Sequence, residues 1–477
     1  MAALHELDAK ALSHAYATRQ ASPVEAVEAF VKHIARWEPA LCAMYAYDPQ
    51  GALADARASQ ARWQAGTPLS PLDGVPVTVK ENIATRGVPM PAGTAASELH
   101  PAPEDAPPAA RLREAGCILL GKTTMPDYGM LTSGLSSFHA LARNPWDLRM
   151  NPGGSSAGAA AAAAAGYAPL HLGTDIGGSI RLPASMCGVF GLKPSLGRIP
   201  IKPPFAGRAA GPMTRSVADA AMLMGPLSRP DWRDTMSLPH QDIAWGSLDI
   251  DVSGLRLGLL LDAGWGLPAE PQVAAAVQAA ARLFEAAGAS VEDIAPFSTR
   301  EMIDGLDRFW RMRSWLDISA LPPQRQAKVL PYIREWVSTA ATLSAAEVFH
   351  GYSQMGALRE AAVRACQPFD FVLSPVAPVA GYLAESASPI DDPMRPFEHI
   401  AFTLPYNMSE QPAASIDCGH TSGGLPIGLQ IAGRRHDDLG VLRLARAWER
   451  MRPAPRGWPS PPQGGLATGS LAFASAS

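Results

Sequence analysis

Cysteine is scarce in this chain of 477 residues, and the cysteines present are not arranged to act together. The five are scattered, odd in number and never in a CxxC spacing: Cys42, Cys117, Cys187, Cys366 and Cys418. A disulfide framework needs an organised, even set of cysteines, and a zinc site needs closely spaced ligands. We therefore expect a reduced, cytoplasmic protein without a metal site.

The chain also lacks a strong net charge, long hydrophobic runs and a leader-like N-terminus. Its formal net charge of −4 is too small to indicate a nucleic-acid partner. No apolar run approaches the ~20 residues that span a bilayer. The first residues, MAALHELDAKALSHAY, include acidic side chains and no apolar signal-peptide core. These absences predict no membrane span, no nucleic-acid partner and a cytoplasmic location.

Apolar residues, by contrast, are abundant enough for a large core. Hydrophobic residues make up 47% of the chain and charged residues 18%. Strand patterns at residues 75–80 and 255–261 alternate with helix patterns at 157–166 and 271–287. No internal repeat or long linker interrupts this alternation. The sequence therefore predicts one large α/β domain with helices on both faces of its sheet.

Two glycine-flanked serine turns stand out in residues 151–194. One is GGSS at 153–156 and the other is GGS at 177–179, with an alanine-rich helix predicted between them. Successive N–H groups in such turns can converge on an anion, as an oxyanion hole requires. A serine hydroxyl is a weak nucleophile, and Lys80, at the end of a predicted strand, is a candidate base if burial keeps it neutral.

Two other patterns indicate different chemistry, and both fit their surroundings poorly. Residues 116–123, GCILLGKT, satisfy the Walker A pattern, but a predicted helix precedes the first glycine and strand-like residues follow it. We expect Lys122 to be a structural or surface lysine. Residues 154–158, GSSAG, fit the GxSxG nucleophile elbow, yet a turn precedes them where an elbow needs a strand. None of the eleven histidines lies in a setting that identifies it as a base.

The motifs from about residue 73 to residue 449 resemble those of the amidase signature family, serine hydrolases that cleave amide and related bonds. They are LDGVPVTVKEN at 72–82, ARNPWD at 142–147, GGSS at 153–156, GTDIGGSIRLPA at 173–184, CGVFGLKPSLGRI at 187–199, DFVLSPVAP at 370–378 and GLPIGLQIAG at 424–433. The resemblance implies an α/β/α domain around a mixed, twisted sheet, and no metal or organic cofactor.

The resemblance also implies roles for individual residues. Lys80 would take a proton from Ser155, a serine on a cis peptide, and Ser155 would take one from the nucleophile Ser179. The implied oxyanion hole consists of the N–H groups of Ile176, Gly177, Gly178 and Ser179. The implied supporting residues are Asp175, Arg181, Ser156 and Gly154. One departure exists, since Ala157 replaces the first glycine of a usual GGSSGG; this change is harmless if Ala157 begins the helix.

The expected organisation has three parts. Residues 1–65 form a helical segment packed on the core, residues 66–452 form the catalytic domain, and the Pro/Gly/Ser-rich residues 453–477 are unstructured. Within the domain, a helical region at about 295–366 is rich in aromatic side chains. Two interpretations of these aromatics stay open, core packing or a substrate cover: Phe309, Trp310, Trp315, Tyr332, Trp336, Phe349 and Tyr352.

The predicted function is hydrolysis of C–N bonds in amides with an apolar or aromatic substituent, extending to anilides, carbamates (urethanes) and esters. An apolar pocket is expected from Met125, Met130, Leu131, Gly134, Leu135 and Phe138. The expected partners are a small-molecule amide or carbamate and, at most, a second copy of the chain in a homodimer. Two alternatives are the amidase subunit of a tRNA-dependent amidotransferase, which needs partner subunits, and a non-catalytic binding protein.

Overall fold

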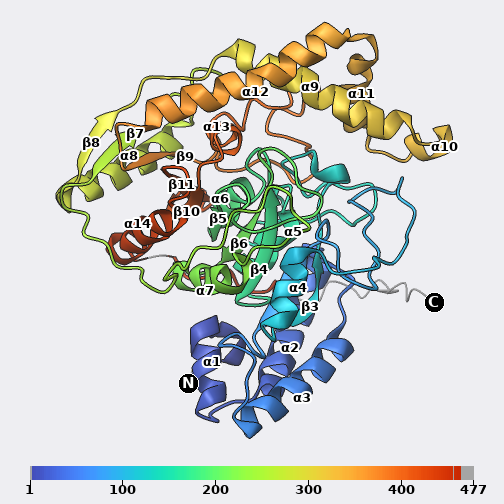
Figure 1. Cartoon of the computed structure of the whole chain (residues 1–477), viewed down its shortest axis with the longest axis vertical. Coiled ribbons are helices and arrows are strands. Elements are labelled where there is room, and N and C mark those ends of the chain that lie inside the picture. The colour runs from blue at the N-terminus through green and yellow to red at the C-terminus, as the bar shows by residue number, and fades with distance from the viewer. Residues whose placement is uncertain (1–2, 455, 463–477) are drawn as a thin grey trace.

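The computed structural model describes residues 3–454 and 456–462, and its centre is an eleven-stranded sheet (Figure 1). The strand order is β1-β3-β2-β4-β6-β5-β10-β11-β9-β7-β8. Both parallel and antiparallel pairs occur in it: β2 is parallel to both β3 and β4, whereas β4 is antiparallel to β6. Helices lie on both faces, so the predicted α/β class with a mixed sheet is confirmed.

One half of the sheet holds the strands that surround the glycine–serine turns. These strands are β1 (Met44–Tyr45), β2 (Pro76–Lys80), β3 (Ile118–Thr123), β4 (Leu170–Asp175), β5 (Phe190–Lys193) and β6 (Ala209–Thr214). Every residue of β2, β4, β5 and β6 is buried, as expected for strands covered on both faces. The GCILLGKT segment contributes strand β3, so its residues do not form a phosphate-binding loop.

The other half of the sheet comes from the C-terminal part of the chain. Its strands are β7 (Arg256–Leu259), β8 (Ser290–Asp293), β9 (Phe371–Pro375), β10 (Ala413–His420) and β11 (Pro426–Gly433). Among the helices that follow β6 are α7 (Val217–Leu227), α8 (Pro271–Ala286), α13 (Leu404–Met408) and α14 (Asp438–Met451). Helix α8 is followed by Gly288, which has a positive φ and ends the helix.

Helices from the beginning of the chain lie at one end of the molecule (Figure 1). They are η1 (Leu4–Glu6), α1 (Ala9–Ala17), α2 (Pro23–Leu41) and α3 (Pro49–Ala65); α4 (Pro107–Glu114) follows β2 and lies nearer the middle, beside β3. Ser22 and Glu25 form a reciprocal capping box at the start of α2, with Pro23 as its first residue. Apolar residues of α2 such as Phe30 and Ile34 are fully buried, so this segment shares one core with the sheet.

A second group of helices covers the opposite end of the molecule (Figure 1). They are α9 (Arg300–Ser319), α10 (Pro323–Gln326), α11 (Pro331–Ser338), η3 (Thr339–Thr342) and α12 (Ala345–Cys366). Helices α9 and α12 meet closely at Gly305 and Gly351: a Cβ at Gly351 would stand 2.3 Å from the Gly305 carbonyl oxygen. The region predicted to be mostly helical is therefore helical, and it packs on the core as a layer of its own.

Helix α5 (Ala157–Ala165) lies between the two serine turns of the site and is buried along its whole length. Alanine suits this position because it favours helix and leaves room for close neighbours. Gly158 shows how close they are, since a Cβ there would stand 2.3 Å from the Ala43 carbonyl oxygen. The helix ends at Gly166, in a left-handed conformation, and the short helix α6 (Arg181–Cys187) lies beside it.

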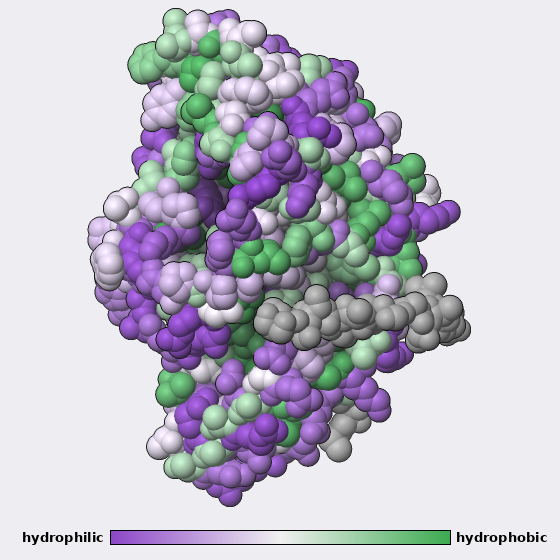
Figure 2. Space-filling view, turned by 90° about the vertical axis from the view of Figure 1, so that its right-hand side faces the viewer, coloured by the Kyte–Doolittle hydropathy of each residue, from purple (hydrophilic) through white to green (hydrophobic). Residues whose placement is uncertain are grey.

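The face shown in Figure 2 mixes hydrophilic residues with small separate groups of hydrophobic ones. No helix in residues 3–454 and 456–462 combines the length and the apolar character that a bilayer crossing needs. Residues 455 and 463–477 of the predicted unstructured tail lie outside the described part of the chain.

Candidate active site

The sheet brings the predicted lysine and the second serine turn to one edge. Strand β2 is parallel to β4, so Lys80 at the end of β2 and Asp175 at the end of β4 leave the sheet in the same direction. Ser179 lies in the turn between β4 and α6, and Ser155 lies in the turn that opens α5. Functional groups of α/β proteins gather at the carboxyl ends of strands for this reason.

Lys80 and Ser155 are in direct contact. Lys80 is fully buried, and its Nζ donates a hydrogen bond of 2.8 Å to Ser155 Oγ. Burial, helped by the positive charge of Arg208, lowers the pKa of Lys80 to about 7. A sizeable fraction of the lysine is therefore neutral near pH 7, which is the state that a base requires.

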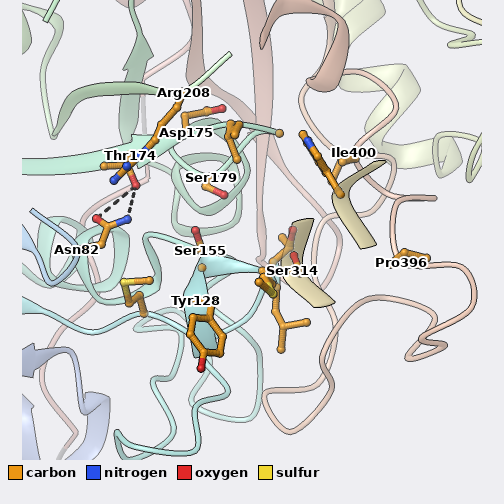
Figure 3. Close-up of a pocket in the computed structure, with 18 of the residues that line it drawn as sticks. Asn82, Tyr128, Ser155, Thr174, Asp175, Ser179, Arg208, Ser314, Pro396 and Ile400 are labelled. Carbon is orange, nitrogen blue, oxygen red and sulfur yellow. Dashed lines mark hydrogen bonds between the residues drawn. The ribbon is translucent and has the colours of Figure 1, made fainter. Parts of the chain in front are cut away.

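Ser155 and Ser179 line the same cavity, and their hydroxyl groups face each other across a short space (Figure 3). The turns that carry them are joined directly, because the N–H of Ser156 donates a 3.1 Å hydrogen bond to the carbonyl of Ser179. The Gly154–Ser155 peptide bond is cis, as the family resemblance implied. The structure thus brings all three residues of the predicted relay together.

The backbone around Ser179 offers N–H groups to an anion, with one correction to the prediction. Ile176, Gly177 and Ser179 line the cavity, and their N–H groups have no acceptor among the described residues. The N–H of Gly178 instead donates a 2.8 Å hydrogen bond to Asp175 Oδ1, and Gly178 does not line the cavity. Of the four predicted donors, three N–H groups are therefore without an acceptor among the described residues, and the fourth is engaged by a carboxylate.

Asp175 and Arg181 contact each other, and Asp175 also accepts hydrogen bonds from the backbone of the Ser179 turn. Both side chains are fully buried, and two hydrogen bonds of 3.0 Å join the guanidinium to the carboxylate. Burial alone would raise the pKa of Asp175, but the charge and hydrogen bonds of Arg181 outweigh it and hold that pKa well below its usual range. Arg181 also donates to Asn407 Oδ1 at 2.6 Å and to Gln430 Oε1 at 2.8 Å.

The two remaining supporting residues, Ser156 and Gly154, are closely packed against the backbone of neighbouring segments. The Ser156 hydroxyl is buried and donates to the Thr174 carbonyl at 3.1 Å. Ser156 is therefore bonded to the backbone, and the elbow interpretation, in which it would be the nucleophile, is wrong for this geometry. A Cβ at Gly154 would stand 2.4 Å from the Ser133 nitrogen, so only glycine fits there. Helix α5 begins at Ala157, so the departure from the family pattern is harmless.

Lys122 is a structural lysine, not a surface one. It is 2% exposed, and its Nζ donates a 2.9 Å hydrogen bond to the Ile83 carbonyl. This contact ties β3 to the segment that follows Lys80.

The cavity at the two serines has a volume of about 290 Å³ and a largely apolar wall. Three of the predicted pocket residues line it: Met125, Met130 and Leu131. The other three do not, namely Gly134, Leu135 and Phe138, which corrects that part of the prediction. Phe138 instead packs edge-on against Tyr45, with ring centroids 5.9 Å apart. The chain leaves the cavity after Thr132. The later residues of the loop were predicted to line the cavity only because they are close in sequence to residues that do.

The aromatic residues of the covering helices divide between the two interpretations that the sequence left open. Trp310, Tyr332 and Trp336 line the cavity, as a substrate cover requires. Phe309 and Tyr352 instead contact each other between α9 and α12, with ring centroids 5.2 Å apart. Trp315 packs on the core around the cavity without lining it, and Phe349 is 71% exposed.

Several polar residues of the cavity escaped the sequence analysis. Arg208, Arg313, Asp317 and His399 all line it. His399 is 2% exposed, and neither of its ring nitrogens has a hydrogen-bond partner among the described residues. Burial lowers the pKa of His399 to about 4, so the ring is neutral at pH 7. No motif marked these residues, because they come from loops and helix faces outside the glycine–serine turns.

No group of three or more His, Cys, Asp or Glu side chains within the described residues is arranged to hold a metal ion. The groups that line the cavity are mainly hydroxyl, amide, guanidinium and apolar ones.

Comparison with known proteins identifies the family. The family model described as Amidase matches residues 25–442. The chain belongs to the amidase family. As an amidase it cleaves C–N bonds by hydrolysis, and the membership inferred from the motifs is confirmed.

Individual relatives of this amidase fall into two groups. It is 37% identical to a glutamyl-tRNA(Gln) amidotransferase subunit from Myxococcus xanthus, over 94% of this chain and 97% of that protein. It is 32% identical to the subunit of the same name from Chloroflexus aggregans, over 94% and 97%. Among solved structures, a bacterial aryl acylamidase of the amidase signature family superposes with a TM-score of 0.87 at 29% identity, over 94% and 97%. The sequence relatives favour the amidotransferase alternative over the free-standing amidase that the sequence alone favoured.

Proposed function

We propose that Ser179 is the nucleophile of this amidase and that Lys80 activates it through Ser155. The observation that carries the proposal is the 2.8 Å hydrogen bond from buried Lys80 to Ser155, in the cavity that Ser179 also lines. A neutral lysine can accept a proton, and the two serines connect it to the cavity.

In the proposed reaction, Lys80 Nζ takes the proton of Ser155 as Ser155 takes that of Ser179. Ser179 Oγ bonds to the substrate carbonyl carbon, and the N–H groups of Ile176, Gly177 and Ser179 bind the oxygen that becomes negative. The C–N bond then breaks, the leaving nitrogen receives the proton through Ser155, and an ester remains on Ser179. Water attacks this ester by the same relay, which releases the acid and restores the serine.

For the substrate, we propose the side-chain amide of glutamine, with this chain as the amidase subunit of a glutamyl-tRNA amidotransferase. The two identities reported above, over nearly the full lengths of both proteins, support this assignment. The released ammonia would pass to partner subunits that act on a charged tRNA. The chain would therefore work with protein partners and a nucleic acid that its own charge does not indicate.

The polar part of the cavity is compatible with a free amino acid. Glutamine carries both a carboxylate and an ammonium group, and the cavity is lined by the guanidinium groups of Arg208 and Arg313 and by the carboxylate of Asp317, besides Asp175, which is paired with Arg181. A site with both signs of charge can pair with each end of such a zwitterion.

A second candidate is a free-standing amidase for aryl or other apolar amides, including carbamates. The observation that favours it is the apolar wall, to which Met125, Met130, Leu131, Trp310 and Phe397 contribute. Under either candidate, we propose that the helical region at about 295–366 covers the bound substrate.

Steady-state ammonia release from glutamine, compared with hydrolysis of an aryl amide and an aryl carbamate, tests these assignments. The amidotransferase proposal expects glutaminase activity and co-purification of partner subunits when a tagged chain is isolated from its native host. Efficient aryl amide hydrolysis by the isolated chain, without glutaminase activity or a partner, would overturn it in favour of the second candidate.

A further inference from the structure

We propose that Arg208 is the residue that binds a carboxylate group of the amide substrate. The inference rests on the proposed function only in requiring an amide at Ser179. It adds the residue that makes the site prefer an amide carrying an anionic group.

Arg208 lies directly beside the reacting groups. It precedes β6, whose first residue, Ala209, pairs with Asp175 at the end of β4. This register sets Arg208 next to the Ile176–Ser179 turn, and Arg208 lines the cavity with Ser155 and Ser179. After burial, its positive charge is the next cause that lowers the pKa of Lys80, because the guanidinium lies near that amine.

The guanidinium of Arg208 has little to bind within the chain. Its one hydrogen bond among the described residues runs from Nη1 to the Pro203 carbonyl, at 3.1 Å, although guanidinium has five N–H donors. No described carboxylate forms an ion pair with it. The nearby Asp234 accepts hydrogen bonds from the backbone N–H groups of Ile201 and Met236, at 2.9 and 2.7 Å.

The surroundings of Arg208 disfavour its charged form. Burial, helped by the second cation, Arg313, lowers the pKa of Arg208 to about 10. Arg313 is itself without an ion pair among the described residues, and it stacks on the Phe205 ring at 4.2 Å. Arg208 and Arg313 line the same cavity and repel each other, and an anion that enters between them relieves part of that repulsion.

Polar neighbours complete a place for the anion. In Figure 3 the Arg208 side chain extends toward Thr174 and Asn82, which are joined to each other by a 3.0 Å hydrogen bond. Both residues line the cavity, so hydroxyl, amide and guanidinium donors meet in one corner of it. A carboxylate accepts bidentate hydrogen bonds from arginine, which a neutral amide substituent cannot match.

A matched pair of primary amides tests the proposal. Glutaramic acid carries a carboxylate at the position where pentanamide carries a methyl group, and both release ammonia. In the wild type we expect kcat/KM for glutaramic acid to exceed that for pentanamide about 10-fold or more, since charge-assisted hydrogen bonds are the stronger ones. Arg208→Gln should lower this ratio by about the same factor, mainly through KM, and Arg208→Lys should restore part of it. Arg282→Gln removes the same charge from an exposed position outside the cavity, and it should leave the ratio unchanged.

The outcomes separate this proposal from the proposed function. If Ser179→Ala stops the release of ammonia from both amides while Arg208→Gln leaves their ratio unchanged, the reaction stands and the carboxylate role of Arg208 is wrong. A second measurement applies even if neither amide is turned over. Glutarate should protect Ser179 from fluorophosphonate labelling in the wild type and not in Arg208→Gln. Equal protection in both proteins would overturn the proposal.

Discussion

The wall of the cavity that carries the two serines and the wall that faces it differ in how far their polar groups are satisfied. In residues 151–194 only Ile176, Ser179 and Gly188 are partly exposed, and the first two of these face the cavity. Behind them, Asp175 and Arg181 are fully buried and paired with each other. Side chains held in this way keep a reacting geometry fixed while substrates come and go.

The facing wall is built from α9, α11 and the loop before Ile400, and its polar groups are less completely bonded. Trp310 Nε1 and both nitrogens of His399 are buried without a partner among the described residues. Arg313 and Asp317 are exposed on α9. Groups left unpaired in an otherwise packed protein are available to a ligand. We therefore expect the first wall to hold the reacting groups in place, and the facing wall to contribute, together with Arg208, to the choice of substrate.

The largest effect should come from the rigid wall. Ser179→Ala removes the proposed nucleophile without adding bulk, and we expect kcat to fall about 10⁴-fold or more. The measurement is amide hydrolysis together with labelling by a fluorophosphonate probe, which should be lost. Ser253→Ala, an exposed serine, is the matched control and should retain both. Turnover near the wild-type level in Ser179→Ala would refute the nucleophile assignment.

Lys80→Met should also abolish most activity, and it should do so while stabilising the fold. Because the pKa of Lys80 is about 7, the rate of the wild type should fall as pH drops below 7, where the amine becomes protonated. In the unfolded chain a lysine has a pKa near ~10.4. The unfolded state therefore binds more protons between about pH 7 and 10, and the free energy of unfolding rises with pH across that window.

Methionine has a similar length and does not titrate, so burying it costs no deprotonation. Lys80→Met should therefore raise the thermal midpoint at pH 7 and make that midpoint less dependent on pH. Thermal unfolding at pH 7 and pH 9, beside pH–rate profiles, checks both expectations. A wild-type rate that stays flat from pH 9 to pH 5 would contradict the neutral-lysine mechanism.

Asp175→Asn tests whether the rigid wall depends on its buried ion pair. The substitution leaves the Arg181 charge uncompensated in a fully buried position, which typically costs about 3–5 kcal/mol. The N–H groups of Gly178 and Ile180 also lose a charged acceptor. We expect a lower thermal midpoint and a kcat reduced about 100-fold, since the oxyanion donors lose their positions. Asp231→Asn, which breaks an ion pair outside the cavity, is the control.

The same difference between the two walls explains which residues of the site could be predicted from the sequence. The rigid wall is encoded locally: glycines where a side chain cannot fit, an alanine helix, and a lysine that ends a strand. Because the motifs of this wall resemble those of a known family, the sequence could indicate that Lys80, Ser155, Ser179, Asp175 and Arg181 lie together. The hydrogen bond from the Gly178 N–H to Asp175 could not be predicted, because it depends on the position that the carboxylate takes in the folded chain.

The facing wall is encoded at long range, and prediction from the sequence was poorer there. Arg313 and His399 reach the cavity from segments far apart in the chain, and they meet only when the sheet and the covering helices pack. A single arginine or histidine in a helix or loop carries no local signal of this. The prediction that Gly134 and Phe138 line the cavity was wrong for a related reason, since the chain leaves the cavity after Thr132.

The smallest effect should come from the facing wall, and it is the sharpest test of the comparison. Trp310→Phe shortens a side chain that lines the cavity and packs edge-on against Phe397, with ring centroids 5.3 Å apart. If this wall selects substrate, KM for an apolar amide should rise about 3–10-fold, while kcat stays within about twofold. Trp315→Phe, in the same helix and outside the cavity lining, should change neither constant. A fall in kcat at constant KM would mean that α9 helps to hold the reacting groups, since an interaction made only in the transition state would have been lost. The two walls would then act as one unit in the reaction.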